Sequence, residues 1–278
     1  KEICSLPRTY RPNQSTISMK QPLFQIKAYL KHWFTSHSKR GDGVHSPFIF
    51  SFITDIKNEK NPYYAYKTIE QIRQNLLNDN SSIQVTDYGS GKSRTRTISS
   101  IEKRSAKSAK QAQLLFRMVN AYQPQTIIDL GTCLGTSTLY LANGQPTATV
   151  YTFEGCPETA KIATRNFQNA NTSNIKLVLG DITDTLPNTL QHLPQIDFVF
   201  FDANHQKKPT LAYFSHCVNK ASKNAVFVFD DIHWSEQMQE AWEIIRQHPN
   251  VSVSVDLYHL GILFFNPELK PAHYNIKL

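Results

Sequence analysis

The sequence predicts a doubly wound α/β fold with a mostly parallel sheet, and three patterns indicate it. Beyond residue 125, seven strand-like apolar runs alternate with segments whose apolar residues recur at helical spacing. Two of the runs contain "FVFF" and "VFVF", which are apolar on both faces, as in strands covered by helices on both sides. The last two runs are joined only by "HLG", which is too short for a parallel crossover. We therefore expect a seven-stranded, Rossmann-like sheet whose last strand is antiparallel.

Each expected element follows from its local pattern. The expected strands cover residues 126–130, 149–154, 175–180, 196–202, 225–231, 251–258 and 261–266. The expected helices between them cover residues 136–143, 157–170, 210–219 and 235–247.

The first 120 residues have a different texture, mostly helix and loop. Helical spacing covers residues 22–38, 64–78 and 106–121. "GDGVHSPFIF" breaks this pattern with Gly and Pro, and "DYGSGKSRTR" predicts a loop. We expect three parts: a flexible tail (1–20), a helical N-terminal extension (21–105) and the α/β domain (106–278).

Composition excludes several classes of protein. No apolar run is long enough to span a membrane, so we expect no membrane association. The net charge is +8, with much of the excess before residue 120, for example in "KSRTRTISSIEKRSAKSAK". A solvated basic surface explains this better than a nucleic-acid site, because no aromatic-rich platform accompanies it. Cys4, Cys133, Cys156 and Cys217 form no CxxC pair, which favours a reducing cytoplasm over zinc or disulfides.

The loop after the first strand of the α/β domain predicts a nucleotide site. "DLGTCLGTS" has Gly131 and Gly135 with three residues between them, which is neither GxGxxG nor a P-loop. Asp129 and Glu154, at the ends of two consecutive expected strands, would repel a pyrophosphate. They suit a cationic ligand that has a ribose diol.

Five motifs in this order strengthen that interpretation. They are "DLGTCLGTS", "VYTFEGCPETAKIATRNF", "LVLGDITDTLP", "IDFVFFDANH" and "FVFDDIHW". Together they resemble the class I methyltransferases that use S-adenosylmethionine, and in particular the catechol and caffeoyl-CoA type O-methyltransferases. The resemblance runs from about residue 106 to the C-terminus.

The resemblance implies a cofactor-binding role for each matching residue. Glu154 would accept hydrogen bonds from both ribose hydroxyls, and Asp181 with the Ile182 amide would face the adenine. Ser137 would form a hydrogen bond with the amino-acid end of the cofactor. Asp129 would act on the same end through the loop amides and through the ammonium group of the cofactor. The remaining expected contacts are Gly131, Cys133, Gly135, Gly155 and Asp202.

The resemblance also implies a metal site and a base. Asp202, Asp230 and Asp231 match the ligands of Mg²⁺ or another divalent cation such as Mn²⁺, although the family has an amide at the position of Asp231. Alternatively, Asp202 and Asp231 cap the following helices or hold the cofactor ammonium.

A histidine stands where the family has its basic lysine. We expect His205 to be the base and Asp202 to assist it. The other candidates for the base are Lys207, Lys208 and His233, and His45 is a candidate for the acceptor pocket if the N-terminal helices fold over the strand ends.

The expected function is S-adenosylmethionine-dependent O-methylation of a small hydroxylated molecule by a cytoplasmic enzyme that could form a homodimer. One alternative is N-methylation of a small amine or a nucleic acid, but "DANH" stands where base-methylating enzymes have Asn/Asp-Pro-Pro-Tyr. Another alternative is a non-catalytic module that only binds S-adenosylmethionine.

Overall fold

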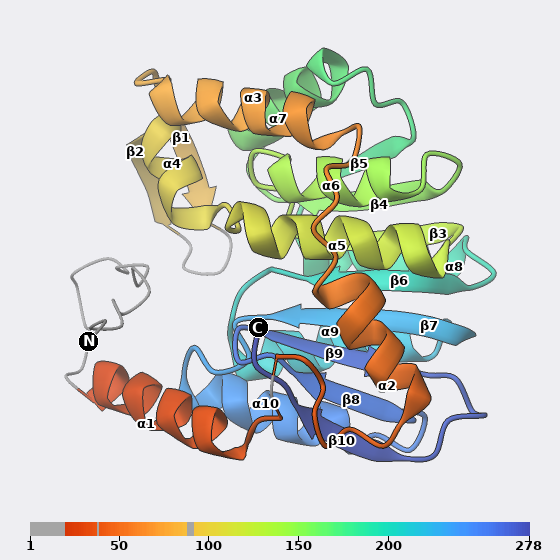
Figure 1. Cartoon of the computed structure of the whole chain (residues 1–278). Helices are drawn as coiled ribbons and strands as arrows, with labels where there is room; N and C mark the ends of the chain where they lie inside the picture. The colour runs from red at the N-terminus through yellow and green to blue at the C-terminus, as the bar shows by residue number, and fades with distance from the viewer. Residues whose placement is uncertain (1–19, 38, 88–91) are drawn as a thin grey trace.

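The computed structural model describes residues 20–37, 39–87 and 92–278 (Figure 1). The helices are α1 (Lys20–Thr35), α2 (Pro47–Ser51), the π-helical η1 (Phe52–Lys57), α3 (Tyr66–Asn78), α4 (Ile98–Ser105), α5 (Ala109–Tyr122), α6 (Thr136–Gly144), α7 (Pro157–Asn169), α8 (Ile182–Gln191), α9 (Lys207–Val218) and α10 (Glu236–Arg246). The strands are β1 (Ser82–Asp87), β2 (Lys92–Thr97), β3 (Thr126–Leu130), β4 (Thr149–Glu154), β5 (Ile175–Leu179), β6 (Ile196–Phe201), β7 (Ala221–Asp230), β8 (Val253–Asp256), β9 (Leu260–Phe264) and β10 (Ala272–Asn275). The expected flexible tail lies almost entirely outside the described residues.

The main sheet confirms the predicted fold class. Within the described residues it has eight strands in the order β10-β8-β9-β7-β6-β3-β4-β5. β9 runs antiparallel to β7 and β8, as the short "HLG" connection predicted, and every other pair in the sheet is parallel. The eighth strand, β10, was not predicted, because its sequence "AHYN" has no apolar run.

Alternate side chains of the central strands pack against helices on both faces. In β7, Val226 and Val228 belong to one apolar cluster, which also contains residues of η1 and α5. Phe227 and Phe229 belong to another, which contains residues of α8, α9 and α10. This burial on both sides explains why "VFVF" has no polar face.

The chain reverses its winding direction at β3. From β3 it proceeds outward through β4 to β5, then crosses back to β6 on the other side of β3. Ligands of open α/β sheets bind beyond the carboxyl ends of the strands at such a switch point. The loops after β3 and β6 should therefore border the ligand crevice.

The N-terminal extension is less purely helical than predicted. β1 and β2 form an antiparallel hairpin, so the prediction of a loop is wrong for the residues that follow the masked segment 88–91. The error has a physical reason: "KSRTRT" is polar throughout, so it gives no apolar strand signal. Contacts between β1 and α7, and the packing of α3 and α4 side chains with α6, attach this part to the main sheet.

Helix α1 lies beside the β8–β10 part of the sheet (Figure 1). Its Gln25 Nε2 donates a hydrogen bond to the Trp234 carbonyl at 2.9 Å, and its His32 bonds with Asp256 at the end of β8. Both contacts are at the carboxyl edge of the parallel strands, so α1 extends over that edge. No helix in the described part of the chain is long and apolar enough to cross a membrane.

Candidate active site

Two glycines of the loop after β3 have positive φ angles, 117° for Gly131 and 85° for Gly135. A Cβ atom on Gly131 would lie 2.6 Å from the Asp202 carbonyl oxygen, and one on Gly135 would lie 2.5 Å from the Phe167 ring. Glycine is therefore required at both positions for backbone conformation and for space. The contact with Asp202 joins the loops after β3 and β6 at the switch point.

Glu154, the last residue of β4, is fixed by backbone donors. Its Oε2 accepts a hydrogen bond from the Cys133 N–H at 2.8 Å, and its Oε1 accepts one from the Cys156 N–H at 2.8 Å. Burial raises the pKa of Glu154, and these hydrogen bonds oppose that rise. Each carboxylate oxygen has a second lone pair, so the side chain can still accept two hydroxyl donors from a ribose.

Asp129 lies beneath the loop, completely buried. Its Oδ2 accepts hydrogen bonds from the hydroxyls of Thr138 at 2.6 Å and Thr152 at 2.8 Å, whereas its Oδ1 has no hydrogen-bond partner within the described residues. Burial raises the pKa of Asp129 to about 6. The carboxyl group thus connects β3, β4 and α6 from below.

The other expected cofactor residues lie along the same edge. Asp181 is the N-cap of α8 and accepts a hydrogen bond from the Thr183 N–H at 2.8 Å, which places Ile182 at the start of that helix. Ser137 is in the first turn of α6, and Gly155 lies between β4 and α7. With Asp202 after β6, the structure thus brings the expected cofactor residues to the ends of four adjacent strands, β6, β3, β4 and β5.

Three acidic residues gather at the ends of β6 and β7. Asp202 follows β6, Asp230 ends β7, and Asp231 comes next. The cluster also contains Lys107, whose Nζ lies 2.9 Å from Asp202 Oδ1 and forms an ion pair with Asp230 Oδ2. The side chains are only 11% exposed for Lys107, 10% for Asp202 and 1% for Asp230, so this is a buried ionic cluster.

The pKa values in this cluster follow from burial and mutual repulsion. Burial raises the pKa of Asp202 well above its usual value, and the neighbouring Lys107 opposes this rise. Burial and the charge of Asp230 raise the pKa of Asp231 to about 7. Burial acts on Asp230 in the same direction, but Lys107 and His205 outweigh it and lower its pKa. The carboxylates in turn outweigh burial at Lys107 and raise the pKa of its ammonium, which stays protonated.

Sequence reasoning missed Lys107, because it belongs to the basic run that was interpreted as a solvated surface. That interpretation fits Lys103 and Lys110, which are exposed, but not Lys107. The only local signal is that Lys107 directly precedes the Ser108 N-cap of α5, which fixes where the chain turns.

This arrangement does not fit a bound divalent cation. Ligand atoms of Asp202, His205 and Asp230 lie within 4.8 Å of one another, as a metal site would require. However, the Lys107 ammonium already bonds with two of these three side chains. A cation between the same oxygens would have to displace it.

His205 is the candidate base that lies within the cluster. Its Nε2 is 3.6 Å from Asp202 Oδ1, and burial lowers its pKa to about 4, although 32% of the side chain remains exposed. The backbone φ angles are positive at Asn204, His205 and Asp231, a conformation that is rare outside glycine and common at functional sites.

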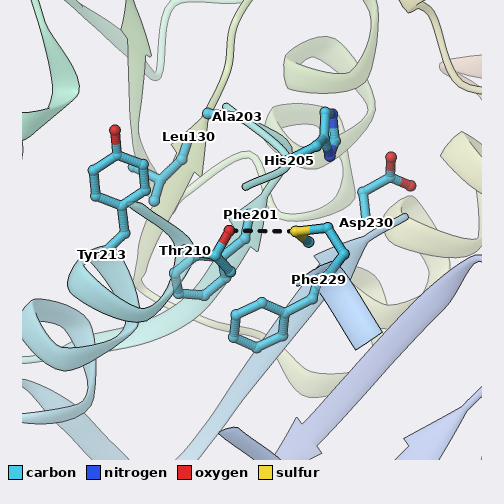
Figure 2. A pocket seen from close by; sticks show the side chains of 9 residues that line it. Leu130, Phe201, Ala203, His205, Thr210, Tyr213, Phe229 and Asp230 are labelled. Carbon is cyan, nitrogen blue, oxygen red and sulfur yellow. Dashed lines mark hydrogen bonds between the residues drawn. The ribbon is translucent and has the colours of Figure 1, made fainter. Parts of the chain in front are cut away.

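The cavity beside His205 and Asp230 has an apolar wall. Figure 2 shows His205 and Asp230 above the Phe201 and Phe229 rings, which stack with their centroids 4.1 Å apart. Thr210 donates a hydrogen bond to Met238 Sδ at 3.6 Å on the same side of this small cavity.

The alternative candidates for the base lie outside the cluster. Lys207 Nζ pairs with Glu240 of α10 at 2.8 Å, and Lys208 is exposed. His233 Nε2 bonds with Asp256 Oδ2 at 2.7 Å, and its Nδ1 lies 3.3 Å from Gln239 Oε1. Because both ring nitrogens of His233 have hydrogen-bond partners, neither nitrogen is available to act as the base.

His45, the candidate for the acceptor pocket, is not among the residues that form this cluster. His45 is exposed just before α2, and the neighbouring Phe48 packs against Phe264 with ring centroids 4.9 Å apart. Phe264 pairs with Val226, which lies in the middle of β7 and not at its carboxyl end. His32 of α1, by contrast, does reach the functional edge. Its Nε2 is 3.2 Å from Asp256 Oδ1.

Comparisons with known proteins identify what this chain is similar to. Residues 128–232 match a family model described as a methyltransferase domain. A catechol O-methyltransferase of Mycobacterium tuberculosis is 37% identical over 131 residues, which cover 46% of this chain and 58% of that protein. A catechol O-methyltransferase of Niastella koreensis is 28% identical over 45% of this chain and 57% of that protein. The matched part of this chain thus spans little more than half the length of either relative.

A solved structure supports the fold over a longer stretch. The Podospora anserina methyltransferase PaMTH1, solved with S-adenosylhomocysteine, has a TM-score of 0.57 at 13% identity and covers 91% of this chain and 99% of its own. Residues 128–232 thus match a methyltransferase domain, and the solved structure shares the fold over most of the chain. These findings also confirm the resemblance to the catechol O-methyltransferase type that the five motifs indicated.

Proposed function

We propose that this protein is an S-adenosylmethionine-dependent O-methyltransferase acting on a small hydroxylated molecule. The observation that supports this most strongly is the placement of Glu154. Its carboxylate is aimed by two backbone N–H groups, retains free lone pairs and stands beside a loop in which both glycines are sterically required.

The cofactor would lie across the ends of β3, β4 and β5. Glu154 would accept hydrogen bonds from the ribose hydroxyls, and Asp181 with the Ile182 amide would border the adenine. Gly131, Cys133, Gly135, Ser137 and Gly155 would approach the ribose and methionine parts. Asp129 would support the loop from below, since its side chain is completely buried.

The reaction is a direct displacement at the methyl carbon. As the acceptor hydroxyl gives its proton to His205 Nε2, its oxygen forms a bond to the methyl carbon. The carbon–sulfur bond breaks, and its electron pair stays on sulfur as the neutral thioether of S-adenosylhomocysteine. Asp202, 3.6 Å from the His205 ring, would stabilise the imidazolium that forms. The protein otherwise contributes by orienting the reacting groups.

The names of the curated relatives favour a catechol or another phenol as the acceptor. We also propose the domain limits that the sequence indicates: an extension over residues 21–105 and a methyltransferase domain over residues 106–278. We also infer a cytoplasmic location, consistent with the free thiols of Cys133, Cys156 and Cys217.

The inferred quaternary structure is a homodimer. Helix α1 exposes apolar side chains on one face, at Leu23, Ile26, Leu30, Trp33 and Phe34. A second copy of the chain would cover this face. Light scattering should give twice the chain mass, and the monomer mass would contradict the inference.

Calorimetry with S-adenosylmethionine tests the cofactor assignment. Glu154→Ala should weaken binding about 100-fold, because two hydrogen bonds to a charged acceptor are lost. Glu158→Ala removes an exposed acid from α7 nearby and should leave the affinity unchanged. Formation of S-adenosylhomocysteine in the presence of a panel of phenols, catechols and amines then identifies the acceptor. Equal affinity in the wild type and Glu154→Ala would contradict the ribose assignment.

A further inference from the structure

We propose that Lys107 takes the place of a divalent cation in this site, so that its ammonium group holds the acceptor oxygen and methyl transfer needs no metal. The proposal rests on the proposed function. It assigns a catalytic role to a residue of the segment that precedes the family-matched domain.

The first observation is where the ammonium lies. Lys107 Nζ is 2.9 Å from Asp202 Oδ1 and is also bonded to Asp230 Oδ2. These are two of the three side chains whose ligand atoms lie close enough for one metal ion. A positive charge from the chain itself thus occupies the place between the carboxylates.

The second observation is that the backbone of Lys107 is held on both sides. Its neighbour Ala106 is the C-cap of α4, with its N–H donating to the Glu102 carbonyl at 3.1 Å. On the other side, Ser108 is the N-cap of α5 and forms a capping box with Gln111. Two helix ends therefore fix the position from which the lysine side chain extends.

The third observation concerns hydrogen-bond capacity. An ammonium group has three N–H donors, and Asp202 and Asp230 take two of them. Within the part of the chain that the structure describes, one donor remains for an acceptor oxygen. The same Asp202 oxygen lies 3.6 Å from His205 Nε2, so an oxygen bonded to Lys107 would be close to the base.

These positions define a metal-free reaction. The acceptor hydroxyl donates its proton to His205 while Lys107 stabilises the negative charge that develops on oxygen. That oxygen bonds to the methyl carbon of the sulfonium, the carbon–sulfur bond breaks, and sulfur keeps the electron pair. Lys107 keeps its own protons throughout and is ready for the next turnover.

The experiment measures Mn²⁺ binding by electron paramagnetic resonance and, in the same preparations, methyl transfer with and without a chelator. The variants are the wild type, Lys107→Ala and, as a matched control, Lys103→Ala, which removes an exposed lysine from α4. We expect the wild type and the control to bind no Mn²⁺ at the cluster and to keep full activity in chelator.

Lys107→Ala should behave in the opposite way. With the ammonium removed, the carboxylates should bind Mn²⁺, and Mn²⁺ should raise the thermal unfolding temperature of this variant alone. Its transfer rate without metal should fall about 100-fold, as when one charge-stabilising donor is removed.

Two results would overturn the proposal: stoichiometric Mn²⁺ binding by the wild type, or loss of wild-type activity in chelator that Mg²⁺ restores. The wild-type measurements decide this even if Lys107→Ala does not fold. Calorimetry with S-adenosylhomocysteine on the same samples separates the two proposals. Absent binding would contradict the proposed function, whereas intact binding with a metal requirement would contradict only the role of Lys107.

Discussion

The acidic residues in the two halves of the sheet's carboxyl edge have different partners. At the ends of β3 and β4, the donors that Asp129 and Glu154 have among the described residues are hydroxyl and backbone N–H groups of their own neighbourhood. At the ends of β6 and β7, the carboxyl groups of Asp202 and Asp230 are held by Lys107, a cation from outside the family-matched domain.

This difference separates two tasks. Neutral donors orient a carboxylate without cancelling its charge, which suits an acid that must bind a ribose diol beside a sulfonium. A buried cluster of carboxyl groups needs a compensating cation, because burying unpaired charge is costly. The first half is complete within the family-matched residues, whereas the second depends on Lys107, which precedes them.

The largest expected effect is at the point where the two halves meet. Gly131→Ala should lower the free energy of unfolding by about 3 kcal/mol or more, because its Cβ would collide with the Asp202 carbonyl at a positive φ. Gly43→Ala is the control: its φ is +80°, but a Cβ there has only an ordinary contact at 3.7 Å. It should cost about 1 kcal/mol. Equal losses of unfolding free energy for the two variants in urea titrations would show that the loops after β3 and β6 are not in close contact.

A second prediction sharpens the division of tasks. His205→Gln should lower kcat about 100-fold while leaving S-adenosylmethionine affinity unchanged, because the base acts only on the acceptor side. His216→Gln alters an exposed histidine on α9 and should change neither quantity. Weaker cofactor binding by His205→Gln would mean that the two halves are not functionally separate.

A third prediction concerns how α1 is attached to the acceptor side. Burial would raise the pKa of Asp256, but hydrogen bonds from His233 and His32 outweigh it and hold this pKa well below its usual value. A lowered folded-state pKa contributes stability above the unfolded value of about 4 and loses it as the pH falls further.

Asp256→Asn should therefore lower stability by about 2 kcal/mol at pH 7 and have a smaller effect near pH 3. Urea unfolding at several pH values measures the difference. The same loss at both pH values would exclude ionisation of Asp256 as its cause.

The smallest expected effect is a gain in the free energy of unfolding. Burial and the charge of Asp230 raise the pKa of Asp231 to about 7. A raised carboxyl pKa means that the folded state binds more protons between pH 4 and pH 7, so stability falls as the pH rises through this window. Asp231→Asn should add about 1 kcal/mol at pH 8 and nothing near pH 4. A loss at pH 8 would mean that the ionised Asp231 stabilises the cluster.

The sequence predicted those parts of the fold and site that depend on local pattern. Runs such as "FVFF" identify strands buried on both faces, and Gly131, Glu154 and Asp181 mark strand ends that the sheet brings together. α8 was missed because Pro187 lies inside it, although Ile182, Leu186 and Leu190 recur at helical spacing.

The rest depends on contacts between distant segments. In "KRSAKSAK", only its place before the Ser108 N-cap distinguishes Lys107 from the exposed lysines around it, and the tertiary fold brings it to Asp202 and Asp230. The same holds for His32, which reaches Asp256 across 224 residues of chain. Paired charges of this kind cannot be read from spacing, since no local period links the partners.

A crystal soaked with S-adenosylhomocysteine and Mn²⁺ tests the central contrast most directly. The account expects the ribose hydroxyls on Glu154, Lys107 Nζ still between Asp202 and Asp230, and no anomalous manganese peak there. A manganese ion between those two carboxylates, with Lys107 turned away, would contradict it.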